Sequence, residues 1–327
     1  MRVLVTGGAG FIGSHLCEAL LHSGHTVYCL DNFDPFYAPG IKRANLANLI
    51  DKSEFTLLEG DILDVSFLNL LFSSYRLDQV IHLAAKAGVR PSLLEPGLYQ
   101  RVNVEGTANI LEQCRLHSVN KVIIASSSSV YGESKNIPFT ESEGALKPIS
   151  PYAASKLATE GLGFTYHHLY GMDVVMLRFF TVYGPRQRPD LAITKFANLI
   201  SQGLPIPVYG DGSTARDYTC ITDIVSGIMA CTRRSFGYEI INLGESKTVT
   251  LKYLIELLEK NLGQKAKIEW LPLQPGDVPF TCADISKAAL LLDYSPGTQI
   301  ESGISSFLPW FNDNKSLLFP QPAPLCP

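Results

Sequence analysis

The stretch VLVTGGAGFIG, residues 3–13, sets four glycines between a short apolar run and an amphipathic stretch. Glycines at such a junction allow a sharp strand-to-helix turn and let the backbone approach a diphosphate, which is stabilised by the helix N-terminus. A glycine pattern becomes specific for a dinucleotide only in this order of strand, loop and helix. We therefore expect a dinucleotide to contact the residues of this turn, which are Gly7, Gly10, Phe11, Ile12 and Gly13.

Short apolar runs rich in β-branched residues alternate with amphipathic stretches through the first half of the chain. This alternation predicts an α/β fold, a Rossmann-type doubly wound parallel sheet covered by helices on both faces. We expect this domain over residues 1–178, with part of 218–243 returning to it, and a smaller α/β substrate-binding domain over 179–327. Strands are expected at 2–6, 25–30, 55–60, 79–84, 121–126 and 173–179, and helices at 12–22, 65–72, 99–117, 152–169, 189–202, 250–261 and 301–312.

The composition excludes several classes of partner. The 27 basic and 31 acidic residues give a net charge of −4, whereas proteins that bind nucleic acids or anionic membranes usually carry a basic surplus. No apolar run reaches the ~18 residues that span a bilayer. The seven cysteines lack metal-type spacing, and the first strand leaves no room for a signal peptide. We expect a cytoplasmic protein with reduced thiols and with no metal, nucleic-acid or membrane partner.

An acidic residue ends the second predicted strand. Asp31 lies 18 residues beyond Gly13, where a carboxylate bonds the adenosine ribose hydroxyls of a dinucleotide. A negative charge there repels the 2′-phosphate of NADP, so the sequence favours NAD. A glycine turn that binds no ligand is the alternative.

The stretch SPYAASK, residues 150–156, contains a tyrosine and a lysine. Ser150 is expected to cap a helix that begins at Pro151, which sets Tyr152 and Lys156 four residues apart on one face. An ammonium near a phenol lowers the tyrosine pKa from about 10 toward neutrality, which makes Tyr152 a usable general base for a sugar hydroxyl. Taken alone, the same spacing also occurs by chance in surface packing.

Taken together, TGGAGFIG (6–13), HLAA (82–85), Asn103, the serine-rich strand end and the YxxxK pair resemble the extended short-chain dehydrogenase/reductases, over nearly the whole chain. Within that family they are most similar to the nucleotide-sugar 4-epimerases. The resemblance implies bound NAD, a UDP-sugar substrate and a homodimer formed through helices near 99–117 and 151–170. It implies Ser127 as a third catalytic residue and a cofactor site that includes Asp31, Asn32, Asp61, Ile62, Leu83, Ala84, Ala85, Lys86, Asn103, Tyr152 and Lys156.

The serine run in IIASSSSVYGE, residues 123–133, suits a linker by composition, but it follows a strand directly. Related 4,6-dehydratases carry an Asp-Glu pair here, and related UDP-glucuronate decarboxylases carry a Glu. Ser128 and Ser129 cannot titrate near neutral pH, so the resemblance disfavours dehydration and assisted decarboxylation. Oxidation at C4 followed by reduction on the opposite face remains.

The stretch LRFFTVYGPRQRPDLA, residues 177–192, bears on the substrate. UDP-glucose 4-epimerases typically have Asn where this chain has Thr181, and RFFTVYGP followed by RPD resembles the UDP-glucuronate 4-epimerases. A carboxylate at C5 needs several donors, which Ser128, Ser129 and Thr181 can supply together with Arg186 or Arg188. Thr181 can instead be an ordinary strand-end hydroxyl, and either arginine can instead bind the diphosphate.

Other substrate contacts are implied in the second half of the chain. GSTARDY resembles the family stretch whose arginine, here Arg216, binds the diphosphate, and LQPGDV resembles the stretch whose Asp, here Asp277, bonds the uridine ribose. Gln274 stands where the family often has an arginine. Pro207 to Tyr209 is expected to offer backbone groups to uracil, with a plain edge strand as the alternative.

The motifs therefore predict a UDP-glucuronate 4-epimerase that keeps NAD bound through its cycle. The alternative substrates are UDP-glucose and UDP-N-acetylglucosamine. A protein of a different class, a non-catalytic NAD-binding sensor, is a further alternative, although such proteins typically lose the tyrosine or the lysine that this chain keeps.

Overall fold

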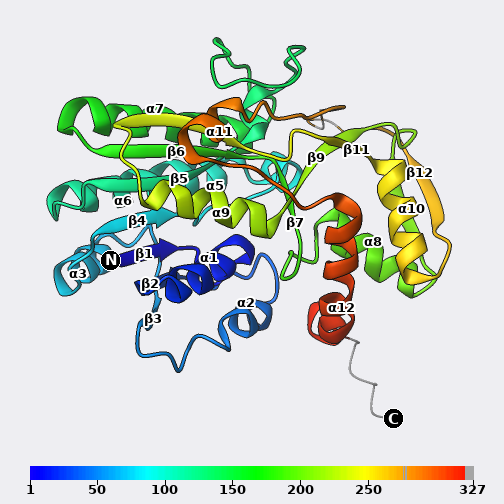
Figure 1. The fold of residues 1–327 in the computed structure, drawn as a ribbon, viewed down its shortest axis with the longest axis horizontal. Helices are drawn as coiled ribbons and strands as arrows, with labels where there is room; N and C mark the ends of the chain where they lie inside the picture. Colours follow the sequence, from blue (N-terminus) through cyan, green and yellow to red (C-terminus); the bar gives the residue numbers. More distant parts are fainter. Residues whose placement is uncertain (275, 277, 321–327) are drawn as a thin grey trace.

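A seven-stranded sheet organises the molecule (Figure 1). The computed structural model describes residues 1–274, 276 and 278–320. The strand order is β3-β2-β1-β4-β5-β6-β10, and all six pairings are parallel, so the chain starts at the centre and winds to both edges. The predicted Rossmann-type fold is confirmed. The strands are β1 (Arg2–Thr6), β2 (Thr26–Asp31), β3 (Phe55–Glu59), β4 (Gln79–His82), β5 (Lys121–Ser127), β6 (Asp173–Phe179) and β10 (Tyr238–Leu243).

Alternate residues of the central strand enter two separate hydrophobic cores, one on each face of the sheet. Val3 and Val5 pack in the core that contains α1 and α9, whereas Leu4 packs in the core that contains α3, α6 and residues of α7. Burial of each such side chain contributes about 1.5–3 kcal/mol, so both faces hold the sheet. The helices are α1 (Phe11–His22), α2 (Pro39–Leu46), α3 (Val65–Ser74), α4 (Val89–Leu94), α5 (Pro96–Tyr99), α6 (Gly106–Leu116), α7 (Pro151–Tyr170) and α9 (Ile221–Thr232), with a 3₁₀ turn η2 (Ser128–Tyr131).

The helix predicted over 99–117 is interrupted by a π-helical segment, η1 (Gln100–Glu105). Within it, the Asn103 side chain accepts from the Lys86 amide (2.8 Å) and donates to the Lys86 carbonyl (3.0 Å) and to Ser155 (2.9 Å). The wider turn places this amide against the end of β4. Such π-helical turns occur often at functional sites, and the 3.6-residue apolar period does not reveal them.

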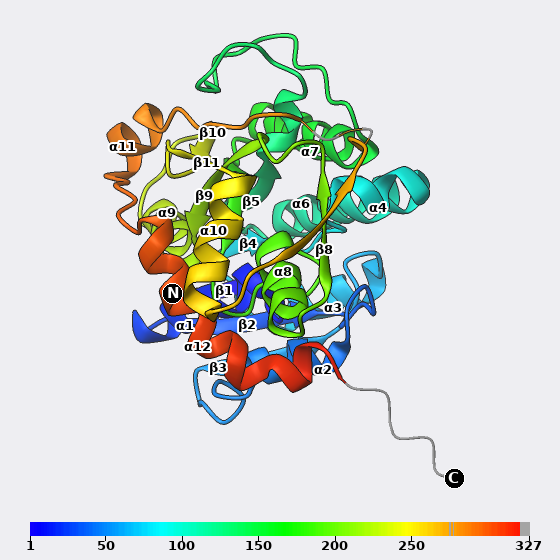
Figure 2. The ribbon, with the colours of Figure 1, turned by 90° about the vertical axis from the view of Figure 1, so that its right-hand side faces the viewer.

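The rest of the chain forms two small sheets and a helical layer beside the main sheet (Figure 2). Residues of α8, α10 and α12 share one continuous core with α1 and β1, which fixes this part against the main sheet. Helices α2, α4, α9 and α11 were not predicted, and the helix expected at 301–312 continues to Leu318. These elements are β7 (Thr181–Tyr183), α8 (Ala192–Ser201), β8 (Pro205–Tyr209), β9 (Ala215–Cys220), β11 (Thr248–Thr250), α10 (Leu251–Leu262), β12 (Lys267–Leu271), α11 (Ser286–Leu292) and α12 (Ile300–Leu318).

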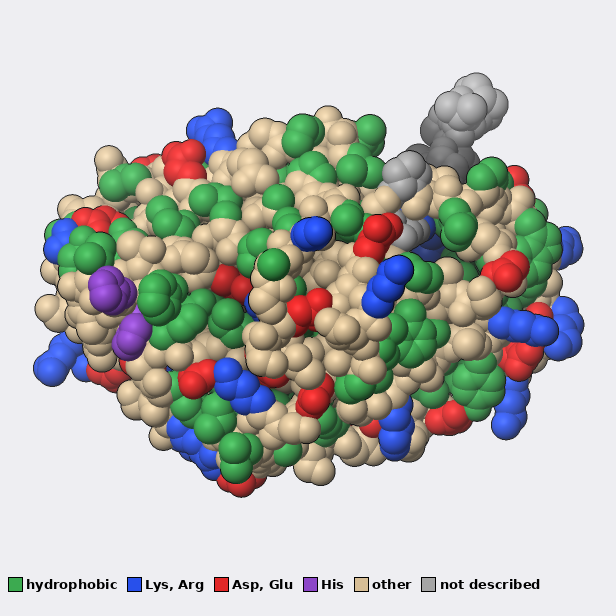
Figure 3. Space-filling model, turned by 90° about the horizontal axis from the view of Figure 1, so that it is seen from above, with side chains coloured by type: hydrophobic (Ala, Val, Ile, Leu, Met, Phe, Trp, Pro, Cys, Tyr) green, Lys and Arg blue, Asp and Glu red, His purple; other side chains and the backbone are tan. Residues whose placement is uncertain are grey.

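The surface carries charges of both signs. Figure 3 shows acidic, basic and hydrophobic side chains interspersed on the face seen from above, without a basic field of the kind that binds nucleic acid. Among the helices of the described residues, none combines the length and the apolar character needed to cross a membrane.

The contact between α12 and β7 predicts a stability difference. A Cβ on Gly303 would lie 2.6 Å from the ring of the buried Tyr183, whereas one on Gly161 in α7 would meet nothing within 4 Å. We expect Gly303→Ala to destabilise the fold by about 1–3 kcal/mol. The control, Gly161→Ala, should be neutral or stabilise it by up to about 1 kcal/mol. Denaturant unfolding measures both, and equal midpoints for the two variants would contradict this packing.

Candidate functional site

A cavity of about 770 Å³ opens at the carboxyl ends of the parallel strands. This is the edge at which doubly wound sheets bind ligands. Its wall combines the glycine loop, the ends of the strands from β2 to β6, the start of α7, and residues of β7 and β9. The predicted residues that line it are Gly7, Gly10, Phe11, Ile12, Gly13, Asp31, Asn32, Asp61, Ile62, Leu83, Ala84, Ala85, Lys86, Ser127, Tyr152, Lys156, Thr181, Arg188 and Arg216.

The glycine loop has the close backbone approach that a diphosphate site needs. Gly7 has a φ of +68°, and a Cβ there would lie 2.8 Å from the Ala84 amide nitrogen. A Cβ on Gly13 would overlap the Gly7 carbonyl oxygen. Helix α1 has no side-chain cap at Gly10, and its first turn lines the cavity, so its amides are placed to bind an anion. The loop therefore fits the expected diphosphate.

The Asp31 carboxylate is fixed at the end of β2. It accepts from the amides of Ala9 (3.1 Å) and Phe33 (2.9 Å), and the Lys42 ammonium lies 3.4 Å from it. A carboxylate has about four acceptor sites, so capacity remains for ribose hydroxyls. Sequence reasoning did not single out Lys42, which holds this charge in place from α2.

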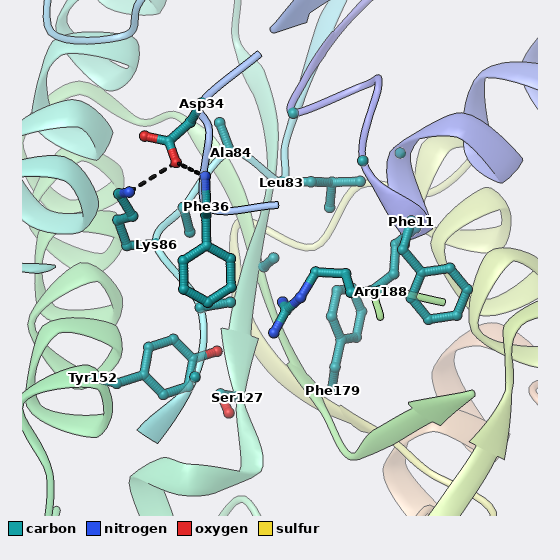
Figure 4. A pocket seen from close by; sticks show the side chains of 18 of the residues that line it. Phe11, Asp34, Phe36, Leu83, Ala84, Lys86, Ser127, Tyr152, Phe179 and Arg188 are labelled. Atoms are coloured by element: carbon teal, nitrogen blue, oxygen red, sulfur yellow. Dashed lines mark hydrogen bonds and ion pairs between the residues drawn. The ribbon is translucent and has the colours of Figure 1, made fainter. Parts of the chain in front are cut away.

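Two further acids organise the same side of the cavity. Asn32 donates to Asp61 (3.0 Å), which also accepts from the Leu63 amide (2.8 Å). Asp34 accepts from the Lys86 ammonium at 2.8 Å (Figure 4). The predicted Asn103 does not line the cavity, and its described bonds fix the Lys86 backbone behind the wall.

Tyr152 and Lys156 lie in the cavity wall on one face of α7, which begins where Ser150 accepts from the Ala153 amide (3.1 Å). The Lys156 ammonium donates to the Ala125 carbonyl at 2.7 Å. Burial lowers the pKa of Lys156 to about 8, and the charge of Glu160 opposes this effect.

Burial raises the pKa of the Tyr152 phenol, whereas Ser127 and Arg188 act to lower it. In the protein alone, the effect of burial on the pKa of this phenol therefore exceeds the effects that favour the phenolate. The physical reason is that burial disfavours the charged form of each group, and the ammonium is directed at the Ala125 carbonyl. Formation of the phenolate thus calls for a further positive charge in the cavity.

The structure separates the two candidate arginines. Arg186 has a φ of +65°, pairs with Glu18 of α1 at 2.6 Å and does not line the cavity. Arg188 lines the cavity and pairs with Asp190 (2.9 Å) while lying 5.4 Å from the centre of the Phe36 ring. Figure 4 shows its side chain reaching into the cavity beside Phe36.

Several predicted substrate residues lie away from the cavity wall. Ser128 and Ser129 belong to η2 and do not line it, because the chain turns there, and Ser129 bonds Ser127 instead (3.1 Å). Pro207 and Tyr209 belong to β8 and do not line it either. Asp277 lies outside the described residues.

Sequence reasoning also missed part of the wall. The segment after β2, with the sequence DNFDPFY, contributes acidic and aromatic side chains, and its cluster of aromatic residues in a polar loop was the available signal. Arg90 contributes from α4, and its guanidinium lies 4.2 Å from the centre of the Tyr209 ring. Within the described residues, no group of acidic, His or Cys side chains has an arrangement that holds a metal. The missed wall residues include Asp34, Phe36, Tyr37, Lys42, Arg90, Gln187 and Tyr218.

Comparison with known families fits this architecture. The family model described as GDP-mannose 4,6 dehydratase matches residues 4–307. The chain belongs to that family. It is thus an extended short-chain dehydrogenase/reductase, as its motifs predicted. Membership in the GDP-mannose 4,6-dehydratase family does not by itself give the reaction, because positions 128 and 129 carry serines and not an acid pair.

Individual relatives are similar over nearly the full length. A UDP-glucuronate 4-epimerase of Thermodesulfobacterium geofontis is 43% identical, covering 96% of this chain and 97% of its own. The solved UDP-glucuronic acid 4-epimerase from Bacillus cereus, in complex with UDP-glucuronic acid and NAD, has a TM-score of 0.91 at 38% identity, covering 96% and 99%. A UDP-glucose 4-epimerase from Thermotoga maritima, solved with UDP-glucose, has a TM-score of 0.89 at 31% identity, covering 96% and 100%.

The glycine loop predicts how NAD binding responds to a single methyl group. Since a Cβ on Gly13 would overlap the Gly7 carbonyl and displace the loop, we expect Gly13→Ala to lose at least about 2 kcal/mol of NAD binding, which is roughly thirtyfold in Kd. Gly97→Ala is the control, because a Cβ there meets nothing within 4 Å. Calorimetric titration of the NAD-free proteins with NAD measures both, and an unchanged Kd for Gly13→Ala would contradict the assigned site.

Proposed function

We propose that this protein is a UDP-glucuronate 4-epimerase that interconverts UDP-glucuronate and UDP-galacturonate with tightly bound NAD. The observation that carries the proposal is one cavity in which the glycine loop, the Tyr152–Lys156 pair and the Arg188 guanidinium converge. Relatives with this activity in their names, at 41–43% identity over at least 94% of the chain, support the same conclusion.

The proposed chemistry uses the side chains at the end of β5 and the start of α7. Bound NAD would accept a hydride from C4 of the sugar and return it to the opposite face. Tyr152 takes the proton of the C4 hydroxyl as the ketone forms and gives it back afterwards. Ser127 hydrogen-bonds the reacting oxygen, and Lys156 stabilises the phenolate and bonds the nicotinamide ribose. The raised pKa of Tyr152 in the protein alone implies that the positive nicotinamide completes the base.

The remaining residues of the cofactor site divide by the part of NAD that they hold. The glycine loop, with Phe11 and Ile12, takes the diphosphate, and Asp31 takes the adenosine ribose. Asn103 acts by fixing Lys86. The adenine side and the wall of the cofactor site are assigned to Asn32, Asp61, Ile62, Leu83, Ala84, Ala85 and Lys86.

In this proposal the substrate lies on the side of Tyr152 opposite the cofactor. Thr181 and Arg188 line the cavity there, and they supply a hydroxyl and a charge for the carboxylate at C5. Arg216 binds the diphosphate of the UDP-sugar. Pro207, Tyr209 and Asp277 remain the proposed uridine contacts. Ser129 acts through Ser127, because its backbone amide donates to the Ser127 hydroxyl at 3.1 Å.

The alternatives fit the cavity less well. A neutral group at C6, as in UDP-glucose or UDP-N-acetylglucosamine, would give the cationic Arg188 no anion from the substrate. A sensor without turnover has no use for a tyrosine and a lysine set together in the cavity. We therefore favour the uronate over both.

We propose that the enzyme works in the cytoplasm as a homodimer. The six described cysteines are free thiols, which suits a reducing compartment. Large apolar side chains are exposed on neighbouring helices α6 and α7, as expected for a helix-mediated interface: Leu116 is 53% exposed, Phe164 51% and Leu169 60%.

The proposed function predicts a substrate preference. Proton NMR of the purified protein with UDP-glucuronate should show UDP-galacturonate forming without added NAD, because the cofactor stays bound. The matched incubation with UDP-glucose should stay unchanged. Turnover of UDP-glucose alone would contradict the substrate and leave the C4 chemistry in place, and no turnover of any UDP-sugar would contradict the function.

The two arginines provide a test of charge recognition at the substrate. Arg188→Ala removes the guanidinium that lines the cavity, whereas Arg186→Ala removes one that pairs with Glu18 outside it. We expect the first to lower kcat/KM for UDP-glucuronate by about 1.5–3 kcal/mol, roughly ten- to a hundredfold, and the second to change it less than threefold. Steady-state kinetics decides, and equal losses for both variants would contradict the placement.

A further inference from the structure

Helix α7 is joined to the carboxyl end of β5 at three successive positions. Tyr152, Lys156 and Glu160 recur every four residues and so share one face of the helix. Ser127 of β5 acts to lower the pKa of the Tyr152 phenol. The Ala125 carbonyl accepts from Lys156 at 2.7 Å, and the Ser126 hydroxyl donates to Glu160 at 2.6 Å. In the third contact Ser126 lines the cavity and Glu160 does not, and neither has a role in the chemistry described above.

Glu160 is a fully engaged, buried carboxylate. Its side chain is 4% exposed, and besides Ser126 it accepts from the Arg178 guanidinium through Nε (2.9 Å) and Nη2 (2.8 Å). Charge-assisted bonds of this bidentate kind favour the ionised carboxylate even where water is excluded. Arg178 is in turn held over the Tyr131 ring, with 4.7 Å between the guanidinium carbon and the ring centre. A carboxylate paired with a guanidinium thus lies one helical turn from Lys156.

The other titratable groups around Lys156 do not supply such a charge. His82 of β4 is buried between Thr6 (2.7 Å) and Thr107 (3.0 Å), and burial lowers its pKa to about 3, so the ring is neutral. Tyr152 is a neutral phenol until it reacts. Among the described groups, Glu160 is the anion whose field opposes the loss of the proton from buried Lys156.

We propose that Glu160 is a positioning residue, whose charge is maintained by the bidentate Arg178 pair so that Lys156 stays a protonated ammonium in the wall of the cavity. Its consequence for catalysis rests on the proposed function, in which the ammonium stabilises the Tyr152 phenolate. The effect of Glu160 on the protonation of Lys156 does not rest on the proposed function, because that effect is a property of the protein alone.

The direct test titrates Lys156 in protein labelled with ¹³C at the lysine Cε, with the resonance assigned by its loss in Lys156→Arg. We expect a midpoint about one pH unit or more lower in Glu160→Gln than in the wild type, since removal of the opposite charge leaves the effect of burial on Lys156 unopposed. Ser126→Ala is the control, because it removes one hydrogen bond from the same carboxylate and keeps the charge. Equal midpoints in Glu160→Gln and wild type would overturn the proposal.

Glu160→Gln leaves the buried Arg178 without its anion, and that can prevent folding. The double variant Glu160→Gln/Arg178→Met removes both charges and avoids this problem. We expect its Lys156 midpoint to fall in the same direction, and a midpoint that stays at the wild-type value would equally overturn the proposal.

Kinetics then tests the consequence for the reaction. The alkaline limb of the kcat profile should move to lower pH in Glu160→Gln, so that activity falls about fivefold or more at pH 8 and less than threefold at pH 6. Glu160→Asp, which restores the charge, should restore the limb. An equal loss at every pH would mean a structural role only and would overturn the proposal. If the wild type turns over no UDP-sugar, the proposed function fails, and the lysine titration still decides the role of Glu160.

Discussion

The hydrogen bond from Lys156 to the Ala125 carbonyl is the contact on which the site depends. It ties the first turns of α7 to the carboxyl end of β5, at the edge where the parallel strands open into the cavity. Tyr152 lies one turn earlier on the same face, and Ser127 lies two residues further along the same strand. A shift of α7 along the sheet would move Tyr152 and Lys156 relative to Ser127, so the mutual geometry of the three groups depends on how α7 is fixed to β5.

Burial is the second constraint, and it acts on the two ionisable partners in opposite directions. It raises the pKa of the Tyr152 phenol and lowers that of Lys156 to about 8, so in the protein alone burial favours the neutral form of each group. The Glu160 carboxylate counters the effect on the lysine. A positively charged cofactor ring would counter the effect on the tyrosine, which couples formation of the base to occupancy of the cavity.

The parts of the site that the sequence predicted are those set by local rules. The loop around Gly7 and Gly13 and the helix that carries Tyr152 follow from turn chemistry, capping and spacing. The two arginines show the limit of such local rules. Arg186 and Arg188 lie two residues apart in one irregular segment, yet Arg188 lines the cavity and Arg186 does not. A left-handed backbone at the first turns it toward Glu18 of a distant helix, and no local pattern contains that partner.

The central claim is that one cavity oxidises C4 and reduces it again without releasing the hydrogen. Incubation of the wild type with UDP-glucuronate deuterated at C4, followed by NMR of the product, tests it directly. The account predicts UDP-galacturonate that retains deuterium at C4 when no NAD is added. Product carrying solvent hydrogen at C4 would contradict it, because the hydrogen would then have left the cavity between the two half-reactions.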